Sequence, residues 1–206
     1  MFRVLITGFE PFGGYSENSS WAVAQKVAAC GVEWVDITLA QMPVSFGRVA
    51  AALRGEVEHH RPNLVVMLGQ SASADCVKLE RVALNMMDSA AGDNDGYTPN
   101  EEPIDECGAA ALFGSLPIKP LRSAIEAKGV RVKISNSAGL YVCNRLYYEA
   151  LRMCKESPYM QAIFIHLPLY EGHPSAKSDK PTLPLEEMIL AVQTLIREIY
   201  DKERGI

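Results

Sequence analysis

The feature that most constrains the fold is a regular alternation of short apolar, β-branched runs with segments whose apolar residues recur at helical spacing. The runs at residues 63–68 (N-L-V-V-M-L) and 161–166 (Q-A-I-F-I-H) are apolar almost throughout, which is typical of strands buried on both faces. Short joins separate the strands from the helices, and this pattern predicts an α/β sandwich around a mainly parallel sheet. Ligands of such sheets bind beyond the carboxyl ends of the strands.

The expected strands and helices follow one another along the whole chain. We expect strands at residues 3–7, 32–39, 63–68, 130–135 and 161–166, and an extended stretch at 77–87. We expect helices at residues 19–29, about 45–59, 119–128, from about 142 onward, and 185–202. Residues 88–106 are polar and rich in turn residues, which predicts a long surface loop. No linker-like segment divides the chain, so residues 1–206 are expected to form a single domain.

Composition and charge exclude several classes of partner. The net charge is -5 and the sequence has no basic cluster, which argues against nucleic acid as a ligand. The apolar run before Gly8 is too short for a signal peptide or a membrane span, so we expect a cytoplasmic protein with no membrane partner. The five cysteines are dispersed without a C-x-x-C pair, and the histidines lack the spacing of metal ligands. We therefore expect neither disulfides nor a bound metal.

One of these cysteines, Cys143, lies where the turn-forming stretch S-N-S-A-G-L-Y runs into the apolar spacing of a helix. Apolar residues recur at i+3, i+4, i+7 and i+8 from it, so the thiol is expected on the inward face of that helix. An ordinary core cysteine is the alternative. The first turn of a helix has free N–H groups and a partial positive charge, which stabilise a thiolate and can receive an oxyanion beside it. Cys143 is therefore a candidate nucleophile.

Two residues are candidate partners of this thiol. His166 ends an expected strand, and in a parallel sheet it would emerge at the same edge from which the strand before Cys143 leads into its helix. Glu80 lies within an otherwise apolar strand, where a carboxylate is costly unless it is paired, and it could orient the imidazole. The alternatives are a hydrogen-bonded histidine at a strand end, and a Glu80 that pairs with Arg81 or faces solvent.

Taken together, five segments resemble the pyroglutamyl peptidase type I family, whose members are also called pyrrolidone carboxyl peptidases. In the family's order they are V-L-I-T-G-F-E-P-F-G-G followed by N-S-S-W, E-R-V-A-L-N, S-N-S-A-G-L-Y-V-C-N, I-H-L-P and P-T-L-P-L-E. The resemblance covers nearly the whole chain. It implies a three-layer α/β/α sandwich with a twisted, mainly parallel sheet, and a cytosolic, cofactor-free, often tetrameric enzyme.

The resemblance also implies an activity and the residues that carry it. The family comprises cysteine exopeptidases that hydrolyse the amide bond after an N-terminal pyroglutamyl residue of a peptide, through a thioester. By this resemblance Cys143 is the nucleophile, His166 the general acid and base, and Glu80 the residue that orients the histidine.

Pyroglutamate is a neutral five-membered lactam, so its pocket is expected to be an apolar slot with a few hydrogen-bonding groups. The residues that match the family's substrate-contacting positions are Phe9, Phe12, Asn18, Gln70 and Tyr141. Tyr15 matches a further aromatic position of the family near this slot. The alternatives are core positions for the two phenylalanines, a helix cap for the asparagine and a turn position for the glutamine.

The sequence departs from the common bacterial pattern of the family in two places. Residues 71–75 are S-A-S-A-D where that pattern has a Gly-Gly-Arg run, and Ala90 replaces an arginine expected near the active site. A charged hydrogen-bond donor at a reaction centre can contribute ~3 kcal/mol of transition-state stabilisation, so slower catalysis or an altered preference is expected. Arg81 and Arg145 are the candidate substitutes.

Two other functions stay open on the sequence alone. A catalytically impaired homologue that binds pyroglutamyl-type or other small ligands would account for the missing arginine. A phosphate- or nucleoside-handling enzyme would account for the glycine-containing loop G-F-E-P-F-G-G after the first strand. That loop lacks a G-x-G-x-x-G or G-K-[ST] pattern, and its two phenylalanines suit a lactam better than a phosphate.

Overall fold

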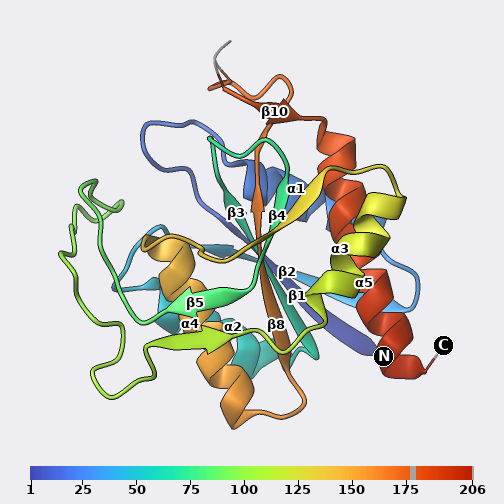
Figure 1. Cartoon of the computed structure of the whole chain (residues 1–206), viewed down its shortest axis with the longest axis horizontal. Coiled ribbons are helices and arrows are strands. Elements are labelled where there is room, and N and C mark those ends of the chain that lie inside the picture. The colour runs from blue at the N-terminus through green and yellow to red at the C-terminus, as the bar shows by residue number, and fades with distance from the viewer. Residues whose placement is uncertain (177–179, 206) are drawn as a thin grey trace.

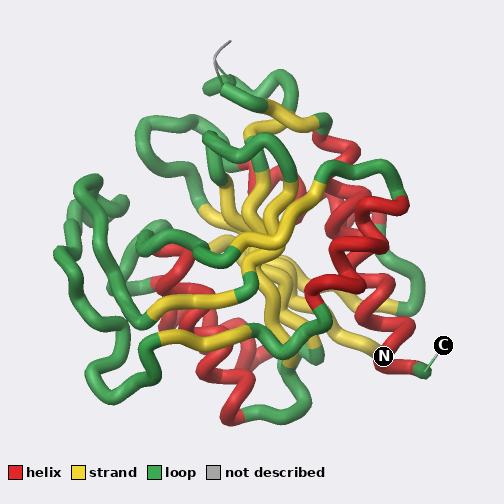
Figure 2. Tube along the Cα trace, in the orientation of Figure 1, coloured by secondary structure: helices red, strands yellow, loops and turns green. Residues whose placement is uncertain are grey.

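A six-stranded twisted sheet in the order β2-β1-β3-β8-β4-β7 runs through the centre of the protein (Figures 1 and 2). The computed structural model describes residues 1–176 and 180–205. The strands of this sheet are β1 Phe2–Phe9, β2 Val35–Met42, β3 Leu64–Gln70, β4 Val77–Glu80, β7 Val132–Ser135 and β8 Gln161–Leu167. Two small sheets pair β5 Val82–Leu84 with β6 Ala111–Phe113, and β9 Leu169–Tyr170 with β10 Thr182–Leu183.

In the described part of the chain, five helices cover the two faces of the sheet. They are α1 Ser19–Cys30, α2 Val49–His60, α3 Ile118–Ala127, α4 Val142–Glu156 and α5 Leu185–Arg204. One hydrophobic core packs α1, α3 and α5 against the side chains of one sheet face, and a second packs α2 and α4 against the other. Alternate residues of β1 and β3 enter the two cores in turn, as the period of a strand requires. The expectation of a three-layer α/β/α sandwich is confirmed.

The sheet is mainly parallel, but two of its strands run against the other four. Strands β2, β1, β3 and β8 are parallel neighbours, whereas β4 is antiparallel to β8 and parallel to β7. The reason lies in the link at residues 71–76, which is far shorter than the dozen or so residues that a parallel crossover needs. The chain turns tightly there, with Ala74 N–H donating to the Ser71 carbonyl, and returns along the far side of β8.

The limits of two strands differ from those expected from the sequence. The strand expected at residues 32–39 begins only at Val35 because Val35 N–H closes a turn on the Val32 carbonyl and Trp34 has a left-handed φ of 67°. The extended stretch expected at residues 77–87 breaks at Arg81, after which β5 leaves the main sheet to pair with β6. Residues 88–106 contain no helix or strand in the described structure apart from one bridge to Met87, as expected for a loop.

Gly8, next to last in β1, allows α1 to begin close to the sheet. A Cβ atom at this position would lie 2.8 Å from the backbone N and Cα of Trp21, which a side-chain rotation cannot relieve. The close approach lets the Ser20 hydroxyl accept a hydrogen bond from Phe9 N–H at 3.0 Å. The carboxyl end of β1 and the start of α1 are thereby fixed together at the edge of the sheet where ligands bind.

Candidate active site

Glu80 and His166 form a buried pair on adjacent antiparallel strands. Lys78 of β4 lies opposite His166 of β8, so Glu80 is the diagonal neighbour of the histidine on the same face of the sheet. His166 Nδ1 is 2.8 Å from Glu80 Oε1, and the two residues are 8% and 1% exposed. The carboxylate is therefore paired with the imidazole and not with Arg81, whose guanidinium donates to Asn136. This bond orients the ring so that Nε2 is available to another partner.

The other partner of the imidazole is Cys143. Burial of the ring lowers the pKa of His166, but hydrogen bonds to Cys143 and Glu80 and the negative charges of both groups raise it more, to about 9. The imidazolium form is thus favoured when the thiolate is present. The Cys143 sulfur, the His166 imidazole and the Glu80 carboxylate thus form a hydrogen-bonded series, which is the arrangement that activates a nucleophile.

Cys143 is the second residue of α4 and is half-buried. Gly139 enters the left-handed region with a φ of 80° in the turn before the helix, and Tyr141 is the N-cap. The first intrahelical bonds run from Asn144 and Arg145 N–H to the Tyr141 carbonyl, so the N–H groups of Val142 and Cys143 donate to no described residue. These two N–H groups and the positive end of the helix dipole stand beside the sulfur.

The route by which the chain brings Cys143 to His166 differs from the expected one. From the sequence, the end of the strand before Cys143 was expected at the same sheet edge as the end of β8. This was wrong, because β7 is parallel to β4 and so runs against β8. The strand ends level with Glu80, and residues 136–141 then cross the sheet to the start of α4 (Figure 1).

A small cavity adjoins the sulfur, and all five residues expected to contact substrate line it. Its volume is about 10 Å³, close to the least that holds one water molecule. Rings of the two more exposed aromatic residues, Phe12 and Tyr141, lie with their centroids 6.2 Å apart, and Tyr15 packs edge-on against Phe12 at 5.9 Å. The lining consists of Phe9, Phe12, Asn18, Val44, Gln70, Tyr141, Val142 and Cys143.

The polar groups of the cavity come from Asn18 and Gln70. Asn18 is also the helix cap that its residue type predicts: its Oδ1 accepts from Ser20 N–H at 3.0 Å and its Nδ2 donates to the Glu10 carbonyl. Gln70 Oε1 accepts from Ser19 N–H at 2.7 Å, while its Nε2 has no hydrogen-bond partner in the described part of the chain. A buried donor without a partner is costly unless a ligand or water satisfies it.

The loop at residues 88–106 is bonded to Phe46 and to the cavity residue Tyr141 by contacts that the sequence did not predict. The Asp93 carboxylate accepts hydrogen bonds from the N–H groups of Phe46, Asp95 and Tyr97. The Tyr141 hydroxyl donates to the Gly92 carbonyl at 3.1 Å, so the loop also holds one wall of the cavity. The D-N-D-G sequence signals a turn, but no local signal identifies the partners of that turn.

The two departures from the family pattern add no charge to the described lining of the cavity. Ala90 is exposed on the loop, and residues 71–75 form the tight turn between β3 and β4. Arg145 Nη1 is 3.5 Å from Glu149, and Arg81 bonds Asn136. Among the described contacts, neither arginine pairs with Glu80, Cys143 or His166.

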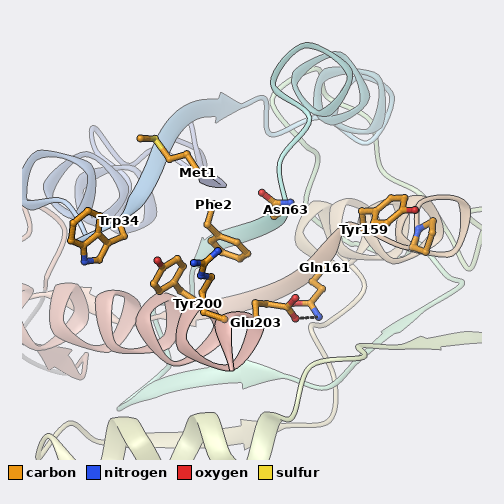
Figure 3. A pocket seen from close by; sticks show the side chains of 10 residues that line it. Met1, Phe2, Trp34, Asn63, Tyr159, Gln161, Tyr200 and Glu203 are labelled. Carbon is orange, nitrogen blue, oxygen red and sulfur yellow. Dashed lines mark hydrogen bonds between the residues drawn. The ribbon is translucent and has the colours of Figure 1, made fainter. Parts of the chain in front are cut away.

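A larger hollow of about 650 Å³ lies at the opposite edge of the sheet, around the amino ends of β1 and β8 (Figure 3). Its walls include the exposed rings of Trp34 and Tyr159 and the Gln161 and Glu203 side chains. Its described lining residues include no cysteine, serine or histidine. Within residues 1–176 and 180–205 we find no cluster of three potential metal ligands, and no helix there is long and apolar enough to cross a membrane.

Gly69 sets the space available to the His166 ring. It is the neighbour of His166 in β3, and a Cβ atom there would lie 2.7 Å from Phe164 Cζ and 3.1 Å from His166 Cδ2. We expect Gly69→Ala to lower stability by about 1–3 kcal/mol and to lower kcat, because the imidazole must shift. Thermal melting and steady-state kinetics measure both effects.

Gly55→Ala is the matched control, since its Cβ would meet no atom within 4 Å and its position within α2 favours alanine. If Gly69→Ala keeps both the melting temperature and kcat of the wild type, the ring does not depend on this space.

Chemistry of this kind, with a sulfur nucleophile and an acid-base pair on an α/β sheet, defines the class of cysteine hydrolases. Comparison with known proteins gives the family. The model of the family described as pyroglutamyl peptidase matches residues 2–202. The chain belongs to this family.

Individual relatives agree with the family match. Pyrrolidone-carboxylate peptidases of Clavibacter michiganensis and Bacillus licheniformis are 34% and 35% identical to the chain; the alignments cover 96% and 98% of it, and 92% and 94% of the relatives. The structure of the pyrrolidone carboxyl peptidase of Thermococcus litoralis has a TM-score of 0.93 at 31% identity, covering 100% of this chain and 97% of that one. Pyroglutamyl peptidase I of Bacillus amyloliquefaciens has a TM-score of 0.88 at 32% identity, covering 95% of each.

Proposed function

We propose that the protein hydrolyses the amide bond after an N-terminal pyroglutamyl residue of a peptide, with Cys143 as nucleophile. The single observation that carries these roles is that Cys143 lines an aromatic cavity and hydrogen-bonds His166, which is itself paired with Glu80. The family match and the relatives support the activity itself.

The cavity suits a lactam because its lining is uncharged. The rings of Phe9, Phe12 and Tyr141 would contact the faces of the five-membered ring, and the free N–H of Gln70 would donate to its carbonyl oxygen. A lactam ring is much larger than the cavity of about 10 Å³, so its entry requires Phe12 and Tyr141 to move apart. Peptides that begin with a charged amino group would lose hydration there, and the only ionisable group among the described lining residues that could offset the charge, the Cys143 sulfur, is paired with His166.

The reaction follows from these positions. The Cys143 thiolate attacks the pyroglutamyl carbonyl carbon, and the N–H groups at the start of α4 hold the oxyanion of the tetrahedral intermediate. As the C–N bond breaks, the His166 imidazolium gives its proton to the departing amine, and a thioester to Cys143 remains. The neutral imidazole then takes a proton from water, the hydroxide adds to the thioester carbonyl, and the C–S bond breaks to release pyroglutamate and the thiolate.

The activity is tested with chromogenic amides. The wild-type protein is expected to hydrolyse the pyroglutamyl amide, and to prefer it about 10²-fold or more over the glutaminyl and prolyl amides, because each lacks the lactam. Release of the chromophore measures kcat/KM for each. A rate near background for the pyroglutamyl amide, with pyroglutamyl peptides still binding in calorimetry, would favour the impaired homologue.

The phosphate-handling alternative has no support from the site. Phe9 at the end of β1 and Phe12 in the following loop lie against the cavity, and Asn18 uses its own side chain to cap α1. A panel of nucleotides and inorganic phosphate should leave the melting temperature unchanged, whereas pyroglutamate should raise it.

We also propose the setting in which the enzyme works. A reducing cytoplasm fits five free cysteines, two of them exposed. A homo-oligomer, a tetramer by family resemblance, fits the exposed apolar side chains of Met1, Trp34 and Phe113. One peptidase domain over residues 1–206 fits a single main sheet with both cores along it.

A further inference from the structure

We propose that Asn144 is a positioning residue whose side-chain amide holds the first turn of α4, and with it Cys143, at its distance from His166. The inference rests on the proposed function only in taking Cys143 as the nucleophile. It concerns a residue outside the substrate cavity and outside the Cys143, His166 and Glu80 set.

Asn144 is fully buried, and its side-chain amide both accepts from and donates to the backbone of β5, as the backbone of a neighbouring strand would. Its Oδ1 accepts from Leu84 N–H at 2.9 Å, and its Nδ2 donates to the Leu84 carbonyl at 2.8 Å and to the Met86 carbonyl at 3.0 Å. Both N–H groups of the amide are thus engaged. The opposite edge of β5 pairs with β6, where Leu84 faces Ala111. The asparagine therefore completes the free edge of β5 from the start of a helix.

The segment that Asn144 holds is continuous with the strand that carries Glu80. Only Arg81 separates Glu80, the last residue of β4, from the first residue of β5. Tyr147, one turn after Cys143 on α4, makes a second tie to the same segment, since its hydroxyl donates to the Glu80 carbonyl at 3.1 Å. The helix of the nucleophile and the strand of the carboxylate are joined by side chains at two points.

These ties matter because the chain before α4 supplies no side-chain cap to the helix. Residues 136–141 cross from β7 through the turn at Gly139, and the N-cap Tyr141 makes no side-chain capping bond. Asparagine is also a poor residue for the interior of a helix compared with alanine. Three tertiary hydrogen bonds give a physical reason for an asparagine directly after the nucleophile.

The variant Asn144→Asp tests this role. It keeps the shape and the acceptor for Leu84 N–H, but it turns a carboxylate oxygen toward the Leu84 and Met86 carbonyls. We expect the repulsion to displace the first turn of α4 and to lower kcat for the pyroglutamyl amide about 10- to 100-fold, with KM changed much less. Protonation supplies the carboxyl with an O–H donor. The ratio of variant to wild-type kcat is therefore expected to rise as the pH falls.

A second readout does not depend on peptidase activity. Iodoacetamide alkylation of Cys143, followed by mass spectrometry at neutral pH, reports whether the sulfur still has its imidazole partner. We expect slower alkylation in Asn144→Asp. If the wild type hydrolyses no pyroglutamyl amide, the proposed function fails, but the alkylation rates still test the position of the sulfur.

Asn85→Asp is the matched control. Asn85 makes the same pattern of bonds, accepting from Asp105 N–H and donating to the Asp105 and Gly108 carbonyls, but it has no bond to α4. It is expected to lose stability while keeping the kcat and the alkylation rate of Cys143.

The proposal is overturned if both variants lower kcat and alkylation by the same factor. It is also overturned if kcat falls in Asn144→Asp while alkylation stays at the wild-type rate or the kcat ratio does not change with pH. If Asn144→Asp does not fold, Asn144→Ala is compared with Asn85→Ala: slower turnover and alkylation only in Asn144→Ala supports the role, and equal rates in the two variants refute it.

Discussion

Replacement of Cys143 by alanine is expected to lower kcat for a pyroglutamyl amide by at least about 10⁴-fold, because no other group can form the thioester. The half-buried thiol is the sulfur that lines the aromatic cavity and hydrogen-bonds His166. Binding should survive, since the cavity walls are unchanged. Chromophore release measures the rate, and calorimetry with a slowly hydrolysed pyroglutamyl peptide measures the affinity.

The control is Cys154→Ala on the same helix. Burial raises the pKa of the Cys154 thiol to about 12, so that thiol stays protonated and unreactive. Its removal should cost some stability and leave kcat unchanged. Comparable turnover by Cys143→Ala and the wild type would remove Cys143 from the mechanism.

The second large effect is expected for Glu80→Gln, which should lower kcat by about 10²- to 10⁴-fold. The amide is neutral, and it can donate to Nδ1 and so favour the wrong tautomer of the ring. The pKa of His166, about 9 in the wild type, should fall toward its ordinary value of 6.5, because burial lowers it and one of the two groups that oppose burial is lost. Nuclear magnetic resonance titration of the imidazole measures this change.

The same shift predicts how stability depends on pH. A raised pKa means that the folded state binds the proton more tightly than the unfolded state. The stabilisation is therefore complete below about pH 6.5 and is lost as the pH rises through about 9. Between pH 7 and pH 10 the melting temperature of the wild type should fall more than that of Glu80→Gln.

Glu149→Gln is the matched control for this pair. Glu149 is 2% exposed and forms ion pairs with Arg54, Arg145 and Arg152, away from the histidine. Its loss should destabilise the protein and leave the titration of His166 unchanged. If Glu80→Gln keeps the wild-type kcat and the wild-type titration, Glu80 does not orient the ring.

Much of the fold and the site could be predicted because local signals carry them. The apolar runs identified the central strands, and the turn before Cys143 identified the start of α4. The family resemblance predicted both members of the Glu80 and His166 pair. It also predicted every residue that lines the cavity except Val44 and Val142.

What could not be predicted depends on contacts distant in sequence. The direction of β4 follows from the link at residues 71–76. The sequence shows how short this link is, but not that it passes β8 to place β4 on the far side. The roles of Asp93 and Asn144 follow from backbone groups 47 and 60 residues away, at Phe46 and Leu84. Single polar residues in a turn and a helix give no sign of such partners.

The short link at residues 71–76 has a practical consequence for protein engineering. Exposed turns usually tolerate inserted peptides or fused domains well. Here the link is short, and for that reason β4 runs antiparallel to β8. This direction points the Glu80 carboxylate toward the His166 imidazole. A tag placed in this turn would loosen the constraint on strand direction and with it the pairing of Glu80 and His166.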